Sequence, residues 1–466
     1  MTASGPGFRL SQEDPKDHLL WYYFSMDLEE TIVAVATPVG EGAIALLRLS
    51  GPAALEILHG VFRPKGNTMA PRCACFGEIH DVSGKLDEVL VTFFPGPKSY
   101  TGEDVVEISC HGGVLLVRRM LDLLLRRGAR LATPGEFTQR AFLNGKMDLT
   151  QAEAVIDLIK AQTELALRAA NEQLAGHLGS DLTDVQEQLL TILAHIEAYI
   201  DFPDEPIDPD TGKALLARFQ ELEICLDRLL ATAAQGYVLR HGLRTVIFGE
   251  PNVGKSSLLN LLLGYERAIV SPIPGTTRDT IEEVINVHGI PVRLIDTAGT
   301  RESSDSIESE GIRRTLQQVE QADLVIEVVD GSKSNSRIDR NRRMLLVLNK
   351  IDLGLHSDWV ETDGLRFSCT QRIGVEQLNQ AIWDWVMGGT VQLNDIRVAI
   401  NARHQSCLQR AKAALEQSRH SLEAGQSPEF ISIELRDALD AVGEVIGKTN
   451  SEDLLEKIFS EFCIGK

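Results

Sequence analysis

The chain has 466 residues, of which 43% are hydrophobic and 24% are charged, a composition typical of a soluble globular protein with two to four domains. It excludes the fibrous, disordered and membrane-spanning classes. The 67 acidic residues outnumber the 46 basic ones and give a net charge of −21, so the field of the whole protein does not attract nucleic acid. An RNA partner would need a local basic patch, and five arginines between residues 118 and 130 form a candidate: Arg118, Arg119, Arg126, Arg127 and Arg130.

Seven cysteines are scattered along the chain without the paired spacing of a disulfide framework or a structural zinc site, which favours a reducing compartment. The first 30 residues are acidic and hold no apolar run of signal-peptide length, so we expect a cytoplasmic protein that does not enter a membrane. We interpret residues 1–30 as a flexible N-terminal extension. Met26 offers an alternative start, so residues 1–25 need not belong to the native protein.

Short apolar runs alternate with glycine and proline between residues 31 and 149. Residues 31–35 and 44–49 have the composition of strands, and the period of the apolar residues predicts a helix over 114–125. We therefore expect an α+β domain over 31–149.

Helical periodicity dominates residues 150–241 and returns over 391–466, while residues 242–390 alternate between strand and helix signals. We interpret this pattern as one discontinuous all-α domain into which an α/β domain is inserted. Residues 151–240 hold 16 acidic and 6 basic residues, about half of the total acidic excess. The fold class is therefore multidomain, with α+β, all-α and α/β parts.

The clearest motif is a phosphate-binding loop. Residues 244–248 resemble a buried strand, residues 249–256 match G-x-x-x-x-G-K-S, and a helix is predicted to follow. Gly249 and Gly254 let backbone N–H groups converge on phosphate oxygens, and Lys255 adds a positive charge. Ser256 can offer its hydroxyl to magnesium. The strand, loop and helix context makes a chance glycine turn a poor alternative.

The identity of the nucleotide base is indicated by residues 345–352, a predicted strand that ends in the motif N-K-x-D. The carboxylate of Asp352 can accept hydrogen bonds from N1–H and from the 2-amino group of guanine. Adenine offers neither donor, so a desolvated carboxylate would stay unpaired at a cost of ~1–3 kcal/mol. Residues 367–370 are predicted to form the loop behind the base. The two motifs together predict GTP.

Two further segments complete the pattern of a nucleotide-dependent switch. Residues 275–279 form a candidate switch loop, and residues 296–299 (D-T-A-G) end a predicted strand. Asp296 can hold magnesium indirectly, and Gly299 can place its N–H against the γ-phosphate. Loss of that phosphate would release both loops, which makes a two-state switch.

Position 300 is threonine, where related switches place the glutamine that orients the attacking water. Hydrolysis therefore needs another water-positioning group and another source of positive charge. Glu302, Glu308 and Glu310 follow in a polar stretch, although any one of them could equally be a solvated loop charge.

Several longer motifs lie outside the nucleotide-binding set: R-L-S-G at 48–51, S-Y-T-G-E-D at 99–104, H-G-G at 111–113, the run 134–146, and F-C-I-G-K at 462–466. With them the chain resembles the tRNA-modification GTPase MnmE (TrmE) family from residue 31 to its end. The resemblance implies a homodimer in which the N-terminal domain binds folate and an inserted Ras-like P-loop G domain hydrolyses GTP. It also implies a heterotetrameric complex with the flavoprotein MnmG (GidA), which installs a carboxymethylaminomethyl-type group at C5 of the wobble uridine of tRNA.

The resemblance also implies site residues in the G domain. Glu308 becomes the favoured glutamate for positioning water, and Lys255 and Asn252 complete the catalytic set. A potassium ion beside the β- and γ-phosphates can do the work of an arginine finger. The implied K⁺ ligands are Asn252, Ser271, Ile273 and Thr276, and the implied Mg²⁺ ligands are Ser256 and Thr277. The positions implied for GTP are Asn252, Val253, Gly254, Lys255, Ser256, Ser257, Ser271, Pro272, Ile273, Pro274, Gly275, Thr276, Thr277, Asp296, Thr297, Ala298, Gly299, Asn349, Lys350, Ile351, Asp352, Ser368, Cys369 and Thr370.

For the folate, 5,10-methylene- or 5-formyl-tetrahydrofolate, the implied positions are Arg48, Glu107, Lys146 and Lys466. A carboxylate suits the guanidine-like edge of the pterin, and cations suit the glutamate tail. Each of these residues taken alone could equally form a surface salt bridge. Cys463 belongs to the C-x-G-K end and could serve either catalysis or packing.

Two other functions stay open on the sequence. The nucleotide motifs alone would suffice for a non-catalytic GTP-dependent RNA or ribosome assembly switch, and a folate-dependent transferase with a regulatory GTPase is also conceivable. The 31–149 domain and the C-x-G-K end favour the family resemblance, since no KH pattern or second G domain accompanies them. One departure is that only 18 residues, mostly polar, separate Asp330 from Asn349, which leaves little sequence for the usual intervening helix.

Overall fold

The computed structural model describes residues 29–38, 40–66, 69–201, 209–265, 282–295, 318–334, 344–388, 400–449 and 452–466. The chain forms two compact units, one made of Met1–Glu153 with Gly447–Lys466 and the other of Ala154–Ile446. The C-terminal segment therefore packs with the N-terminal unit, whereas the sequence-based boundaries group it with the helices. The exact domain boundaries remain a prediction.

The first unit is built on a seven-stranded sheet in the order β3-β4-β5-β6-β2-β1-β7. Its strands are antiparallel except that β1 pairs with β7 in parallel. The predicted strands at 31–35 and 44–49 correspond to β1 and β2. The strand bounds are β1 Ile32–Val35, β2 Gly42–Ser50, β3 Phe62–Pro64, β4 Cys75–Asp81, β5 Gly84–Phe94, β6 Val105–Gly112 and β7 Arg130–Leu131.

Alternation along the strands gives this sheet one apolar face, which α2 (Ala54–His59) and α3 (Val114–Arg126) contribute to burying. The observed α3 confirms the helix predicted over 114–125. Its buried side chains, Met120, Leu123 and Leu124, lie three and four residues apart and so share one helical face. The opposite face of α3 keeps its arginines in solvent.

A short helix, α4 (Glu136–Leu143), is buried along its whole length. Arg140 is fully buried and forms ion pairs with Glu136 at 2.9 Å and with Glu103 at 3.1 Å, so its charge is compensated. The C-terminal helix α15 (Glu452–Ser460) packs against α4, and a Cβ at Gly135 would lie 2.6 Å from the carbonyl oxygen of Phe459. This close approach seats the chain end on the first unit.

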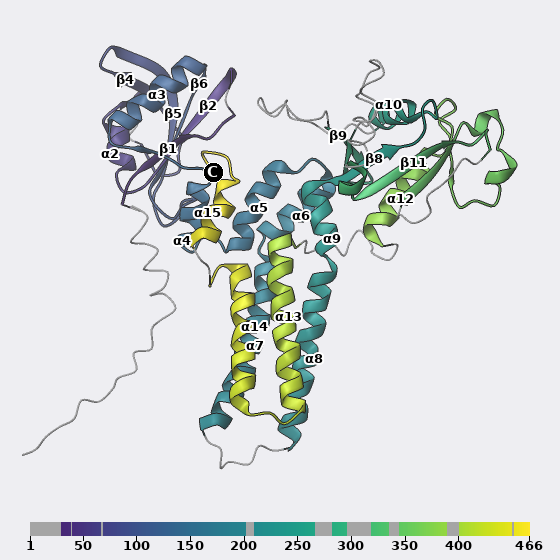
Figure 1. The fold of residues 1–466 in the computed structure, drawn as a ribbon. Coiled ribbons are helices and arrows are strands. Elements are labelled where there is room, and N and C mark those ends of the chain that lie inside the picture. The colour runs from purple at the N-terminus through teal and green to yellow at the C-terminus, as the bar shows by residue number, and fades with distance from the viewer. Residues whose placement is uncertain are drawn as a thin grey trace, which may run out of the picture. The chain divides into compact units, whose positions relative to one another are not determined.

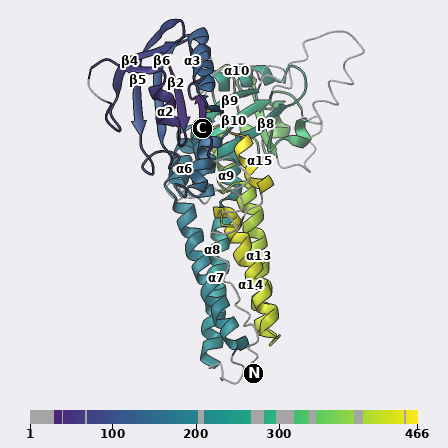
Figure 2. The same ribbon diagram turned by 90° about the vertical axis from the view of Figure 1, so that its left-hand side faces the viewer.

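The second unit contains a bundle of long helices (Figure 1). Apolar residues from α7 and α8 and from α13 and α14 form one shared core, although a six-stranded sheet lies between the two pairs in the sequence. Figure 2 shows the same helices running side by side from another direction. The helix bounds are α6 Glu164–Leu174, α7 His177–Asp201, α8 Pro209–Ala231, α9 Ala233–His241, α13 Ala402–Glu423 and α14 Pro428–Ile446, and α5 Leu149–Lys160 begins in the first unit and ends in the second.

Within the described ranges, no helix combines the length and the apolar character needed to cross a lipid bilayer.

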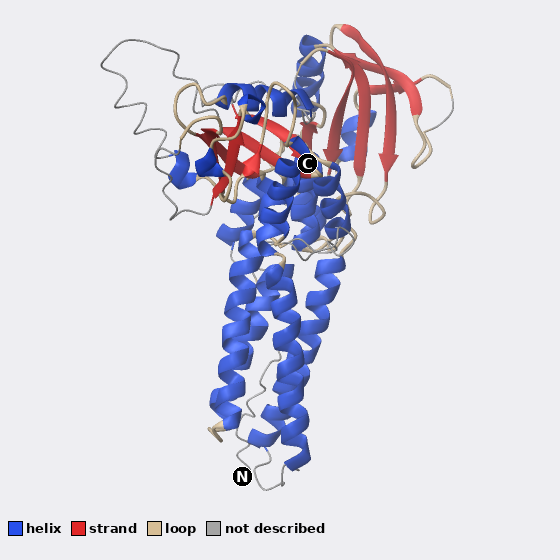
Figure 3. Cartoon of the chain, turned by 90° about the vertical axis from the view of Figure 1, so that its right-hand side faces the viewer, coloured by secondary structure: helices blue, strands red, loops and turns tan. Residues whose placement is uncertain are grey.

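The second unit also holds a six-stranded sheet in the order β13-β12-β11-β8-β10-β9; Figure 3 draws the strands of both sheets in red. Only β9 is antiparallel to its neighbour. After β8 the chain forms β9 and β10 on one side of that strand and then crosses over to form β11 on its other side. Ligands bind at such a switch point of a parallel sheet. The bounds are β8 Leu243–Phe248, α10 Lys255–Tyr265, β9 Glu282–Val287, β10 Ile290–Ile295, β11 Leu324–Asp330, β12 Met344–Asn349, β13 Leu365–Arg366 and α12 Val375–Met387.

Candidate functional site

The loop after β8 lies directly against the ends of two neighbouring strands. Gly249 has φ 153°, and a Cβ there would lie 2.2 Å from the carbonyl oxygen of Val328 on β11. Gly254 has φ 105°, and a Cβ there would lie 2.2 Å from Nδ2 of Asn349 on β12. Only glycine fits at these two positions, and the resulting open backbone, followed by the N-terminus of α10, fits a chain of phosphates.

Lys255 is the first residue of α10 and turns back over the loop. Its Nζ donates hydrogen bonds to the carbonyl oxygens of Gly249 at 2.9 Å and Glu250 at 2.8 Å. Burial lowers the pKa of Lys255, which a nearby phosphate would oppose. Ser256 follows on the exposed side of the helix, where its hydroxyl can bind magnesium. The roles of Lys255 and Ser256 in binding phosphate and magnesium stay a prediction.

Asn349, at the end of β12, ties the phosphate loop to the loop at 367–370. Its Nδ2 donates to the carbonyl oxygen of Val253 at 2.8 Å, and its Oδ1 accepts from the backbone N–H of Cys369 at 3.2 Å. The residue is 2% exposed, so both of its polar ends are satisfied within the protein. One side chain therefore fixes two loops that come from distant parts of the sequence.

Lys350 has φ 63°, in the left-handed region, and directs its side chain back to the phosphate loop. Its Nζ donates to the carbonyl oxygen of Asn252 at 2.7 Å and to Asp330 at 2.8 Å. Burial alone would raise the pKa of Asp330, but hydrogen bonds from Lys350 and Ser332 hold it below the usual value. Asp330 is thus an ionised partner that keeps Lys350 in place.

Sequence reasoning missed Asp330 as a site residue. The signal was its position at the end of a buried parallel strand, since the carboxyl ends of such strands meet at the ligand-binding edge of the sheet.

Asp352 presents an oriented carboxylate at the same edge. Ser368 donates to Oδ1 at 2.6 Å and Thr370 donates to Oδ2 at 3.3 Å. The hydrogen bond from Ser368 is the main reason why the pKa of Asp352 lies below its usual value. The carboxylate is therefore ionised and acceptor-only at neutral pH, which fits the two donors on guanine.

Many of the positions implied for the switch and the cations lie outside the described residues. They are Ser271, Pro272, Ile273, Pro274, Gly275, Thr276, Thr277, Asp296, Thr297, Ala298, Gly299 and Glu308. The described part of the nucleotide site therefore includes the loop with Gly249 and Gly254, as well as Lys255 and Asp352.

A second polar cluster lies on the sheet of the first unit. Arg48 on β2 and Glu107 on β6 are direct partners in the strand register, and Arg48 donates to Oε1 of Glu107 from Nε at 3.0 Å and from Nη2 at 2.8 Å. Arg48 also donates from Nη1 to the carbonyl oxygen of Gly465 at 3.4 Å. Both strong bonds use the same oxygen of Glu107, so Oε2 faces no competing bond from Arg48.

Lys466 joins this cluster, but Lys146 does not. Burial lowers the pKa of Lys466, and the neighbouring charge of Arg48 lowers it further. Lys146 instead donates to the carbonyl oxygen of Pro97 at 2.9 Å. Cys463 is an exposed residue of the same C-terminal segment. The structure thus brings three of the four implied folate residues together.

The mostly parallel six-stranded sheet of the second unit, with the glycine loop after β8 and the carboxylate of Asp352 at the same edge, has the features of a P-loop G domain. Residues 31–146 match the family described as GTP-binding protein TrmE N-terminus, and residues 149–463 match the MnmE helical domain. The chain belongs to the MnmE family and combines a TrmE-type N-terminal domain, a helical domain and a G domain.

Two relatives show the extent of the similarity. The tRNA modification GTPase MnmE of Akkermansia muciniphila is 52% identical over 94% of this chain and 100% of its own length. The protein of the same name from Syntrophotalea carbinolica is 48% identical over 94% of this chain and 99% of its length. Among solved structures, the G domain of the T. maritima FeoB iron transporter is 28% identical over 31% of this chain and 98% of that chain, with a TM-score of 0.22.

The orientation of Asp352 predicts a change of base preference on substitution. Asp352→Asn should weaken GDP binding at least about tenfold and strengthen XDP binding, because the amide can donate to the 2-oxo group of xanthine but cannot accept two bonds. Calorimetric titration with both nucleotides measures the change. Asp363→Asn, at an exposed carboxylate nearby, is the control, and unaltered GDP binding by Asp352→Asn would contradict the assignment.

Proposed function

We propose that this chain hydrolyses GTP and uses the cycle in the modification of wobble uridine in tRNA. The observation that carries the nucleotide part is the carboxylate of Asp352, held by Ser368 and Thr370 at the same sheet edge as the phosphate loop. The tRNA part rests on near full-length similarity to proteins named tRNA modification GTPase MnmE.

Residues of the loop and of the neighbouring strand ends would bind different parts of the nucleotide. Backbone N–H groups from Asn252 to Ser257 and the ammonium of Lys255 bind the β- and γ-phosphates and stabilise charge that develops on them. Ser256 and Thr277 would hold Mg²⁺, which neutralises phosphate charge when bound. The side chain of Asp352 orients the base and so fixes the position of the phosphate chain.

Water positioning and the extra positive charge need further groups, because Thr300 replaces a glutamine. We assign Glu308 to accept a hydrogen bond from the attacking water. Asn252, Ser271, Ile273 and Thr276 supply oxygen atoms of the type that K⁺ prefers. Asn252 suits this role because its side chain is exposed at the loop while its backbone carbonyl accepts from Lys350.

The polar cluster of the first unit is the proposed folate site. Oε2 of Glu107 can accept from the guanidine-like edge of the pterin while Oε1 stays bonded to Arg48. Lys466 lies close enough to Arg48 and Glu107 for both to affect its pKa, so it adds a cation for the ligand. Lys146 bonds to the carbonyl oxygen of Pro97 and not to Arg48 or Glu107. It would therefore contact the end of the ligand that lies farthest from Glu107.

The proposed function includes an assembly with a second copy of the chain and with a flavoprotein. We place the G domain as an insertion in a discontinuous helical domain, since helices from both sides of it share one core. A homodimer would join the flavoprotein MnmG in the cytoplasm and install a carboxymethylaminomethyl-type group, with 5,10-methylene- or 5-formyl-tetrahydrofolate as carbon carrier. The alternative is a non-catalytic GTP-dependent assembly switch for RNA or ribosomes.

The proposed cation site predicts potassium-dependent hydrolysis. GTP hydrolysis should be at least about tenfold faster in KCl than in NaCl, because a bound cation supplies the charge of an arginine finger. Asn252→Gly should remove most of this difference, and glycine tolerates the φ of 65° at that position. Phosphate release measures the rates, with Asn260→Ala on α10 as control. Equal rates in the two salts would contradict the site.

The proposed folate site predicts a role for the charge on Glu107. Glu107→Gln should weaken binding of 5-formyl-tetrahydrofolate at least about tenfold, because hydrogen bonds to a charged acceptor are the stronger ones. Calorimetric titration gives the affinity, and the thermal midpoint verifies folding. Glu56→Gln, at an exposed carboxylate on α2, is the control. If both variants bind like the wild type, Glu107 does not contact the ligand.

The two candidate functions differ in what a deletion of the gene changes. Wobble uridines should lose their C5 substituent, as read by mass spectrometry of tRNA nucleosides, and wild-type protein but not Asp352→Asn should restore it. An assembly switch would instead leave the wobble uridines intact and alter the ratio of ribosomal subunits. Intact wobble uridines would therefore reject the modification function.

A further inference from the structure

The guanidinium of Arg48 lies close to two aromatic rings of the first unit. Its Cζ is 5.5 Å from the centre of the Tyr100 ring and 5.8 Å from the centre of the Phe137 ring. A cation within about 6 Å of a ring centre is attracted by the electron-rich face of the ring, more strongly where water is excluded. The side chain of Arg48 is only 13% exposed. The two rings therefore help to fix the position of the guanidinium.

Tyr100, in the loop between β5 and β6, is itself held in place. Its hydroxyl shares a hydrogen bond of 2.9 Å with the hydroxyl of Thr138, which is fully buried. The carbonyl oxygen of the next residue, Thr101, accepts from Nδ2 of Asn144 at 2.7 Å. The ring packs against a small group of buried apolar residues, Ile32, Ala34, Ala132 and Phe137. The motif at 99–104 and the run at 134–146 thus supply the two rings that lie beside Arg48.

The bonds between Arg48 and Glu107 use only one oxygen of the carboxylate. Arg48 donates to Oε1 from Nε at 3.0 Å and from Nη2 at 2.8 Å, and Oε2 takes no part in these two bonds. An arginine and a carboxylate frequently form two parallel bonds instead, one to each oxygen. The geometry of this pair therefore depends on where the guanidinium is held.

We propose that Tyr100 is a positioning residue of the folate site, an inference that rests on the proposed function. Its ring holds the guanidinium of Arg48 where Nε and Nη2 both reach Oε1 of Glu107, so that Oε2 stays available to the pterin. Without the ring, the guanidinium can move toward the carboxylate and bond both oxygens, which occupies the acceptor that the ligand needs. Tyr100 thus acts on ligand binding through Arg48.

The test compares removal of the ring with removal of the hydroxyl alone, in the full-length protein. Tyr100→Leu should weaken binding of 5-formyl-tetrahydrofolate roughly tenfold, because a hydrogen bond to a charged acceptor is lost. Tyr100→Phe keeps the ring and should bind within about twofold of the wild type. Calorimetric titration gives the affinities, and the thermal midpoint verifies folding. Tyr237→Leu, at a partly exposed tyrosine of α9, is the control.

A second measurement needs no ligand. A crystal structure of Tyr100→Leu should show Arg48 bonded to both oxygens of Glu107, a change that a general loss of stability would not produce. Tyr100→Met, which also lacks a ring, provides a second variant with the same expected loss of affinity and the same expected change of geometry.

The outcomes distinguish this inference from the proposed function. A wild-type protein that does not bind the folate would overturn the folate site and the role of Tyr100 together. If the wild type binds and the ringless variants bind equally well, only the role of Tyr100 is overturned. The same holds if Tyr100→Phe loses as much affinity as Tyr100→Leu, or if the pair of Arg48 and Glu107 keeps its geometry without the ring.

Discussion

The nucleotide site depends on how closely the loop after β8 approaches the ends of β11 and β12. A Cβ at Gly249 or Gly254 would lie 2.2 Å from atoms of those strands, so the approach is available only to glycine. The side chain of Asn349, which lies against Gly254, bonds Val253 and Cys369 at once. The phosphate loop and the loop at 367–370 are therefore held in one geometry.

A similar long-range constraint shapes the first unit. Gly465 has φ 97°, and a Cβ there would lie 2.7 Å from the carbonyl oxygen of Val35, so the chain end fits tightly against β1. This contact brings the Gly465 carbonyl to Arg48 and the terminal Lys466 beside the same cluster. The proposed folate site thus exists only when the two ends of the sequence are folded together.

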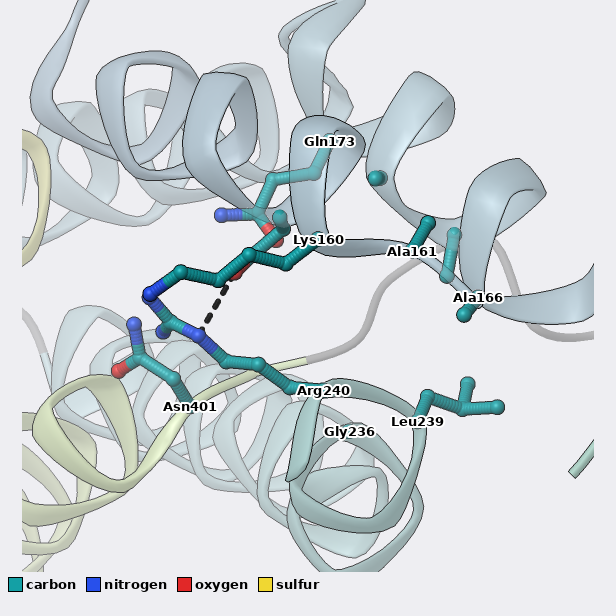
Figure 4. Close-up of a pocket in the computed structure, with 11 residues that line it drawn as sticks. Lys160, Ala161, Ala166, Gln173, Gly236, Leu239, Arg240 and Asn401 are labelled. Atoms are coloured by element: carbon teal, nitrogen blue, oxygen red, sulfur yellow. Dashed lines mark ion pairs between the residues drawn. The ribbon is translucent and has the colours of Figure 1, made fainter. Parts of the chain in front are cut away.

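Because the net charge of the chain is −21, only local clusters of basic residues could attract an anionic partner such as RNA. Within the arginine group at 118–130, Arg119 pairs with Asp81, and Arg130 pairs with Glu30 and Glu136, so part of that positive charge is neutralised. Arg118, Arg126 and Arg127 remain exposed on α3 and its end. In the helical part, Arg240 pairs with Asp157 at 2.7 Å (Figure 4), so its charge is likewise neutralised.

The sequence by itself determined the strands at 31–35 and 44–49, helix 114–125, the phosphate loop and the position of Asp352, because each is set by short-range spacing and backbone preference. The resemblance to a family implied Arg48, Glu107, Lys146 and Lys466 as folate residues, which stay a prediction. Only the tertiary structure decided that Asp330 holds Lys350, that Lys146 bonds to Pro97, and that Tyr100 and Phe137 lie beside Arg48. Such contacts join segments far apart in the chain, so their geometry depends on packing, which local sequence patterns do not specify.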